Sequence, residues 1–205
     1  MTAERAVFGS AANDFVDLVR TIPHQRWGDP GLGEWTVRDL IGHASRSLIT
    51  VYTYLSTPAQ REDIVDATNY YVTVASISAE MGAQAIVDRG RQAGRDLGAD
   101  PAGTVAALAS RAVAAVAAVE DDPLIEVIGG HGIRLSSYLP TRTFELAVHG
   151  LDIARAVGID HTPPAAVLAE TAALAARIGV ALGQGPAVVL ALTGRADLPT
   201  GFSVV

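Results

Sequence analysis

The sequence predicts a mainly α-helical protein, built as a bundle of four long helices with one or two shorter ones. Apolar residues recur at helical spacing along most of the 205 residues. Alanine-rich stretches such as TVAALASRAVAAVAAVE combine high helix propensity with small side chains that let helices approach closely. The hydrophobic fraction is 49% with only 5% aromatic residues, so we expect a core of Ala, Val, Leu and Ile.

Two helices are expected in the N-terminal quarter of the chain. The apolar spacing of residues 3–20 indicates the first, which a run of prolines and glycines ends. The second begins after Thr36, an N-cap residue with Asp39 three positions on, which is a capping-box-like start. This helix is expected to run to about Leu55, and His43 lies beside its apolar stripe.

The middle of the chain predicts two more helices. Residues 68–97 have a helical pattern with Gly98 as a C-cap, although residues 70–74 are types that favour strands. An Asp-Pro pair, suited to the N-cap and first position of a helix, opens a further helix over about 101–120.

The C-terminal part of the chain predicts shorter elements, separated by glycines and prolines. Residues 124–135 hold two short apolar runs around a glycine-rich centre, which indicates a small hairpin or a loop. A helix of about 138–157 follows and is stopped by Gly158. A proline pair opens another helix to about Ile178, and residues 186–192 fit a short helix or a strand.

The length suits one domain with a small appendage. We expect a helix bundle over residues 1–180, and over residues 181–205 a short C-terminal segment that is not an independent domain. The sequence leaves open whether the chain forms a homodimer.

Composition and charge exclude several classes of function. A formal net charge of −7 with scattered arginines gives no support for nucleic-acid binding, which needs clustered positive charge. No signal-peptide pattern and no apolar run of membrane-spanning length occurs, so we expect no membrane association and a cytoplasmic location. The chain has no cysteine, which excludes disulfides, thiolate ligands and a cysteine nucleophile.

A metal site is suggested by Glu145 and His149, whose four-residue spacing puts both side chains on one helix face. His43, on the other predicted helix, supplies a third ligand. Two histidines and one carboxylate would leave a coordination position open, as in catalytic zinc sites. The alternative is structural: a Glu–His ion pair that holds two helices together, and a His43 bonded to a backbone carbonyl.

Two motifs and a closing segment resemble the mycothiol-dependent maleylpyruvate isomerase family, a branch of the DinB-like metal-binding four-helix bundles. The motifs are GEWTVRDLIGHASRS and LPTRTFELAVHGLDIARAVGI, and the closing segment is LALTGR. The resemblance implies that His43, Glu145 and His149 bind a divalent metal. Zinc is the expected ion, and nickel or iron would accept the same ligands.

The resemblance also implies a function. The metal would bind a low-molecular-weight thiol, mycothiol or a similar compound, as cosubstrate, and the thiolate would attack a small electrophile. We therefore expect a thiol transferase or isomerase whose partners are small molecules. A non-catalytic metal-binding bundle and a hydrolase that uses a metal-activated water are the alternatives.

Other residues of the motif region are candidates for supporting roles. Arg142, three residues before Glu145, would steer an anionic substrate or form an ion pair. Asp152 would orient His149. His131, in the glycine-rich segment, would act as a gate, an acid or base, or an occasional fourth ligand, or would simply be exposed.

The C-terminal part departs from the family's named isomerase. That enzyme carries a larger C-terminal domain with an essential arginine, whereas only about twenty-five residues follow the last long helix here. Arg195 is the basic residue of that segment, and it cannot be matched to the family's arginine. Isomerisation of maleylpyruvate is therefore not assigned.

Overall fold

A bundle of four helices forms the body of the computed structural model, which describes residues 2–205, with the side chains of residues 78–81 left out. The elements in chain order are α1 (Ala3–Thr21), the short 3-10 helix η1 (His24–Arg26), α2 (Val37–Tyr54), α3 (Ala67–Met81), α4 (Ala83–Asp96), α5 (Pro101–Ala117), β1 (Leu124–Val127), η2 (Ile128–Gly130), β2 (His131–Arg134), α6 (Leu135–Val157), α7 (Ala165–Ala181) and α8 (Gly185–Leu192).

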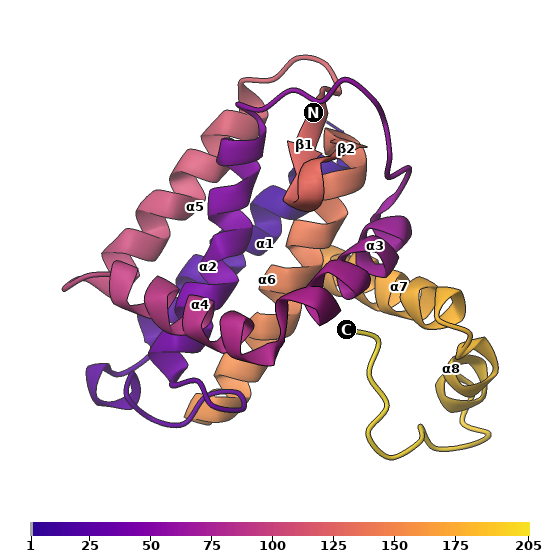
Figure 1. The fold of residues 1–205 in the computed structure, drawn as a ribbon. Coiled ribbons are helices and arrows are strands. Elements are labelled where there is room, and N and C mark those ends of the chain that lie inside the picture. The colour runs from indigo at the N-terminus through magenta and orange to yellow at the C-terminus, as the bar shows by residue number, and fades with distance from the viewer. Residues whose placement is uncertain (1) are drawn as a thin grey trace.

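The bundle consists of α1, α2, α5 and α6. Helices α1 and α2 each pack against both α5 and α6, so the four surround one apolar core (Figure 1). The predicted mainly helical bundle is confirmed. The capping box of α2 is also present, because Thr36 Oγ1 accepts from the Asp39 backbone N–H at 3.2 Å and Asp39 Oδ2 accepts from the Thr36 N–H at 3.1 Å.

The prediction of one helix over residues 68–97 is wrong. The chain forms α3 and α4 with a break at Gly82, whose φ of 78° lies in the left-handed region that glycine tolerates. The break lets the two helices pack against different neighbouring helices. Helix α3 packs against α6 and α7, whereas α4 lies across α2 (Figure 1).

Two helix boundaries also differ from those predicted. Helix α5 ends at Ala117 rather than near residue 120, because the guanidinium of Arg5 donates to the backbone carbonyls of Val119 and Asp121. Helix α6 begins three residues before the predicted start at 138. Its first turn is capped from a distant part of the chain, since Asp122 Oδ1 accepts from the Ser136 N–H at 2.8 Å.

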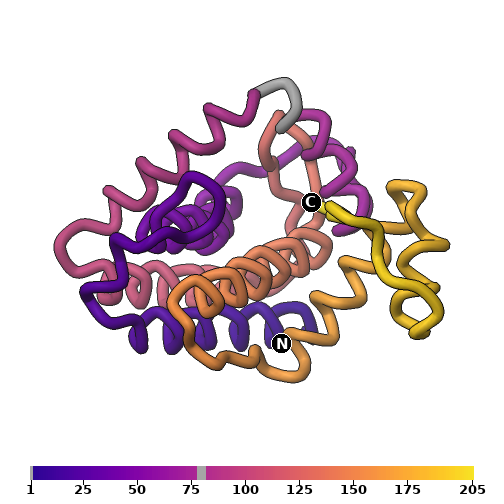
Figure 2. The backbone as a smooth tube through the Cα atoms, turned by 90° about the horizontal axis from the view of Figure 1, so that it is seen from below, coloured from indigo at the N-terminus to yellow at the C-terminus, as the bar shows by residue number. Residues whose placement is uncertain are grey.

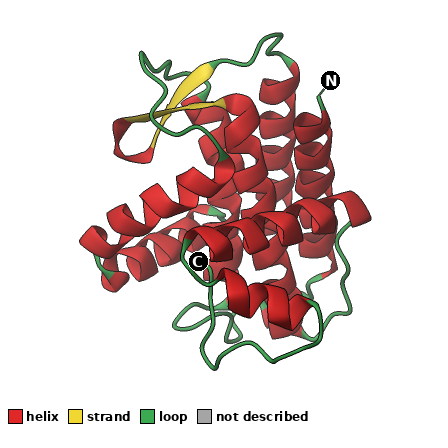
Figure 3. Cartoon of the chain, turned by 90° about the vertical axis from the view of Figure 1, so that its right-hand side faces the viewer, coloured by secondary structure: helices red, strands yellow, loops and turns green. Residues whose placement is uncertain are grey.

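The glycine-rich segment forms a hairpin rather than a loop. Strands β1 and β2 pair antiparallel with Val127 opposite His131, and the turn between them uses Gly129 at φ 77°. In the described part of the chain these are the two strands drawn in Figure 3. Ile125 and Ile133 are buried and fix the hairpin against the bundle.

After α6, Gly158 adopts φ 69° and ends the helix as predicted. Residues 186–192 lie in the helix α8, which settles the choice between helix and strand. The chain then turns back, so that its C-terminal end lies beside α3 (Figures 1 and 2). The division of the chain at residue 180 stays a prediction. None of the described helices combines the length and the apolar character that crossing a membrane requires.

Helices α2 and α4 approach so closely that glycine is required between them. A methyl group added at Gly42 would lie 2.3 Å from the backbone nitrogen of Gly94. We expect Gly42→Ala to lower the free energy of unfolding by about 1–3 kcal/mol, since backbone cannot move aside without shifting α4. Urea unfolding followed by circular dichroism measures this change.

Gly9→Ala is the matched control. Gly9 lies within α1, and a methyl group there would meet nothing within 4 Å. We expect this variant to gain up to about 1 kcal/mol from helix propensity. Equal effects of the two substitutions would contradict the close approach of α2 and α4.

Candidate functional site

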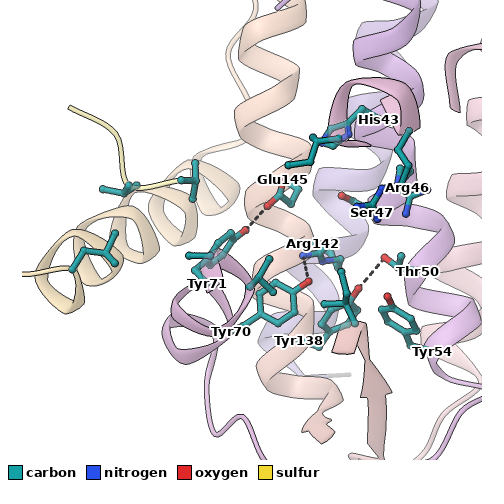
Figure 4. Close-up of a pocket in the computed structure, with 18 residues that line it drawn as sticks. His43, Arg46, Ser47, Thr50, Tyr54, Tyr70, Tyr71, Tyr138, Arg142 and Glu145 are labelled. Atoms are coloured by element: carbon teal, nitrogen blue, oxygen red, sulfur yellow. Dashed lines mark hydrogen bonds between the residues drawn. The ribbon is translucent and has the colours of Figure 1, made fainter. Parts of the chain in front are cut away.

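The candidate site is a cavity of about 360 Å³ at one side of the bundle. Helices α2, α3, α4 and α6 supply most of its lining, and Figure 4 shows the polar side chains that reach it. Of the described residues that line the cavity, three are arginines and one is a carboxylate; they are Arg46, Arg89, Arg142 and Glu145. The cavity therefore has a positive field that favours anionic ligands.

Glu145 and His149 lie one turn apart on α6, as their spacing predicts. Glu145 Oε2 is 3.3 Å from His149 Nε2. The other ring nitrogen, Nδ1, is 3.3 Å from Asp152 Oδ2. The predicted support of His149 by Asp152 therefore has the geometry it needs, because a carboxylate on Nδ1 orients the ring and leaves Nε2 turned toward Glu145.

His43 reaches the same place from α2. Its ring centroid is 5.1 Å from that of His149, and the two rings meet edge to face. On its other side lies Trp35, at 4.4 Å between centroids, which is itself fixed by a 3.0 Å hydrogen bond to the Val87 carbonyl. His43 Nδ1 is buried and has no hydrogen-bond partner, so the ring is positioned by packing rather than by a polar contact.

The three side chains are brought together but are not arranged as a ready metal site. Over the described part of the chain, no three His, Asp or Glu side chains lie as close as a metal ion requires. Both carboxylate oxygens of Glu145 are engaged. Its Oε2 lies against His149, and its Oε1 accepts a hydrogen bond from the hydroxyl of Tyr71 at 2.7 Å.

Arg142 lies at the floor of the cavity, one turn before Glu145. It is 8% exposed, and among the described residues no carboxylate lies within ion-pair distance of its guanidinium. Its guanidinium donates to the Tyr70 hydroxyl at 3.1 Å and to Thr141 Oγ1 at 3.0 Å, and its Cζ lies 4.8 Å from the ring centroid of Tyr138. A buried guanidinium bonded only to neutral oxygens is able to pair with an anionic ligand.

Burial and neighbouring charges shift the pKa values of Glu145, His149 and His43 in different directions. Burial raises the pKa of Glu145, but the hydrogen bond from His149 and the charge of Arg142 outweigh it, and this pKa falls to about 2. Burial lowers the pKa of His149, but hydrogen bonds to Asp152 and Glu145 raise it to about 9. Burial and the nearby charge of His149 lower the pKa of His43 to about 4.

In the metal-free protein we therefore expect the two imidazoles to titrate far apart. His149 should stay protonated up to about pH 9 and His43 neutral down to about pH 4, whereas an unfolded histidine titrates near 6.5. The raised pKa of His149 stabilises the fold fully below pH 6.5, and this stabilisation is lost as the pH rises through 9. The lowered pKa of His43 destabilises the fold as the pH falls from 6.5 toward 4.

Nuclear magnetic resonance of the histidine ring nitrogens measures both transitions, and His43→Ala assigns them. If both rings titrated near pH 6.5, the burial and the contacts described above would be wrong.

The remaining predicted residues lie elsewhere. His131 is the first residue of β2 and is not among the residues that line the cavity, although Ile128 of the same hairpin is. Its role as gate, acid, base or ligand stays a prediction. Arg195 follows α8, is exposed, and donates to the carbonyl of Thr193.

Several lining residues were not found from the sequence. Tyr70 and Tyr71 are of a type that favours strands, yet both belong to α3, where Tyr70 bonds to Arg142 and Tyr71 bonds to Glu145. Arg46, one turn after His43 on α2, also lines the cavity. Its three-residue spacing from His43 was the signal that could have identified it.

One of the comparisons with known proteins gives a match. Residues 8–154 match the family described as Mycothiol maleylpyruvate isomerase N-terminal domain. No curated protein and no solved structure is similar enough to count as a match. The family match covers well over half of the chain and includes His43, Arg142, Glu145 and His149. The chain therefore belongs to the mycothiol maleylpyruvate isomerase N-terminal domain family.

Proposed function

We propose that this protein is a divalent-metal-dependent thiol transferase or isomerase that uses mycothiol or a similar thiol against a small electrophile. The observation that supports it most is the convergence of His43, Glu145 and His149 in a member of this family, beside a cavity that His43 and Glu145 line. A cytoplasmic location and a homodimer remain predictions.

The three side chains fit a metal ion in chemistry, and Glu145 and His149 also fit one in spacing. Two ligands of a tetrahedral zinc ion, each about 2.0–2.1 Å from it, are about 3.3 Å apart, and Glu145 Oε2 and His149 Nε2 are separated by 3.3 Å. His149 has a carboxylate on its other nitrogen, as metal-binding histidines usually do. Two histidines and one glutamate leave a position open for a thiol.

A bound divalent ion would supply the lowering of the thiol pKa that yields a thiolate near neutral pH. The chain's own residues perform the other tasks. Arg142 holds an anionic group of the electrophile, with the Tyr70 hydroxyl keeping the guanidinium in place. Tyr71 fixes the carboxylate of Glu145. Because the chain has no cysteine, the attacking thiol must come from solution.

Cobalt substitution tests this function directly. We expect mycothiol to bind only to the cobalt-loaded protein, to produce a sulfur-to-metal absorption band, and to release a proton on binding. The metal-free protein is the control. No spectral change with mycothiol, glutathione, bacillithiol or cysteine at about millimolar concentration, the weakest affinity relevant to a metabolite, would leave metal-dependent hydrolysis or metal binding alone as the function.

A further inference from the structure

Among the described residues, His43 is the proposed metal ligand whose ring makes no hydrogen bond. Glu145 accepts a hydrogen bond from the Tyr71 hydroxyl. His149 has Asp152 at its second ring nitrogen. His43 Nδ1, in contrast, is buried without a partner. Metal-binding histidines usually have the second nitrogen fixed by a carboxylate, a backbone carbonyl or water, so the orientation of His43 depends on packing instead.

The indole of Trp35 is the group that packs along the His43 ring. The two ring centroids are 4.4 Å apart and the ring planes are inclined by 31°, so the indole lies over the imidazole. His149 meets the same imidazole edge to face, at 5.1 Å and 83°. Because protein interiors are closely packed, rotation of the His43 ring would require one of these two neighbours to move.

Trp35 is itself held at several points. Its Nε1–H donates to the Val87 carbonyl of α4 at 3.0 Å. In the turn before α2, its backbone N–H donates to the Leu32 carbonyl at 3.0 Å, and its carbonyl accepts from the Gly31 N–H at 2.8 Å. The residue is 9% exposed. The indole is therefore a fixed surface against which the imidazole can pack.

Helix α4 meets this indole with a glycine. A methyl group added at the buried Gly90 would lie 2.4 Å from both Cε2 and Nε1 of Trp35. The indole therefore occupies the space that a larger side chain at position 90 would need. A chain of contacts runs from Gly90 through Trp35 to His43 on α2 and His149 on α6. Neither Gly90 nor Trp35 lines the cavity.

We infer that Trp35 is a positioning residue for the proposed metal site, where it holds the imidazole of His43 toward that of His149. This inference rests on the proposed function, since it concerns the same ligands. The indole fixes the direction of the His43 ring, as Asp152 fixes that of His149. The π-electrons of the indole also favour the positive charge that an imidazole acquires when it binds a divalent ion.

The metal-free protein gives the first test. The edge-to-face contact of His43 and His149 should produce a nuclear Overhauser effect between their ring protons in magnetic resonance spectra. We expect Trp35→Leu to lose this effect, because His43 is then able to turn, and Trp35→Phe to keep it. Absence of the effect in the wild type, or an unchanged effect in Trp35→Leu, would overturn the inference.

Competition with a chelator for zinc gives the second test. Trp35→Leu should lower zinc affinity by about 10- to 100-fold, the effect of removing a group that orients a ligand. Trp35→Phe also loses the hydrogen bond to Val87 but retains an aromatic face, so it should lose much less. Gly90→Ala should lower the affinity as well, because the added methyl group displaces the indole. Equal losses in Trp35→Phe and Trp35→Leu would contradict the role of the ring.

A double-mutant cycle separates positioning from general damage to the bundle. If Trp35 acts through His43, Trp35→Leu should cost no further affinity once His43→Ala has removed the ring. Calorimetry at high zinc concentration measures the weak site that remains. A loss of the same size in both backgrounds would make Trp35 a structural residue and overturn the inference.

Trp27→Leu is the matched control. Trp27 is the other tryptophan of the chain, is 8% exposed, and has no ring contact with a histidine in the part of the chain that the structure describes. This variant should keep both the Overhauser effect and the zinc affinity of the wild type. Circular dichroism confirms that each variant is folded before either measurement.

The two proposals can fail separately. A wild type that binds no divalent ion would remove the proposed function, whereas the Overhauser effect in the metal-free protein would still show whether Trp35 orients His43. Zinc affinity that Trp35→Leu leaves unchanged would keep the proposed function and remove the positioning role.

Discussion

Replacement of His43, Glu145 or His149 by alanine is expected to remove the divalent ion from the purified protein. The wild type should hold about one ion per chain, as a three-ligand site does. Loss of a residue that merely supports a ligand costs up to about 100-fold in metal affinity, so loss of a ligand itself should cost at least about 100-fold. Plasma mass spectrometry of dialysed protein gives the occupancy.

His161→Ala is the control for a buried histidine outside the cavity. The His161 side chain is 12% exposed and lies 3.2 Å from Asp14, much as that of His149 is 13% exposed and lies 3.3 Å from Glu145. This variant should retain the ion. Full occupancy in the double variant Glu145→Ala, His149→Ala would show that any bound ion lies elsewhere.

Arg142→Gln is expected to slow the turnover of anionic substrates much more than that of neutral ones. Turnover of an anionic electrophile should fall by about 100-fold, because the group that positions it has lost its charge and its paired donors. A neutral electrophile should lose much less, and metal content should not change, since Arg142 is not a proposed ligand. Steady-state rates with the two electrophiles and metal analysis measure the three quantities.

Arg195→Gln removes one positive charge from an exposed position outside the cavity. It controls for the effect of net charge and should leave both rates intact. If Arg142→Gln slowed turnover of both electrophiles equally, Arg142 would be a structural residue. The proposal of an anionic substrate would then lose its main support.

Local signals in the sequence predicted most helix ends. Thr36 with Asp39, and Gly158, act through neighbouring residues alone, and both were assigned correctly. The starts and ends that differed depend on distant residues. Asp122 caps α6 across the hairpin, and Arg5 bonds to the carbonyls after α5, at separations that no local pattern reveals.

The residues of the candidate site also fall into two groups: those that local spacing predicts, and those whose contacts depend on distant packing. The spacing of Glu145 and His149 on one helix brought them together in the prediction and in the structure. Tyr70 and Tyr71 were missed because their contacts depend on where α3 packs against α6. That packing in turn depends on the break at Gly82, which a helical pattern running through the glycine concealed.

The cavity wall combines a part that the family shares with a part that lies outside it. All three proposed ligands and Arg142 fall within residues 8–154, whereas Leu182, Val204 and Val205 follow that span. For protein engineering, the lining that Leu182, Val204 and Val205 contribute can therefore be varied without a change in the part of the chain that matches the family. Exchange of these three residues would change the shape of the cavity while the helices that carry the proposed ligands keep their sequence.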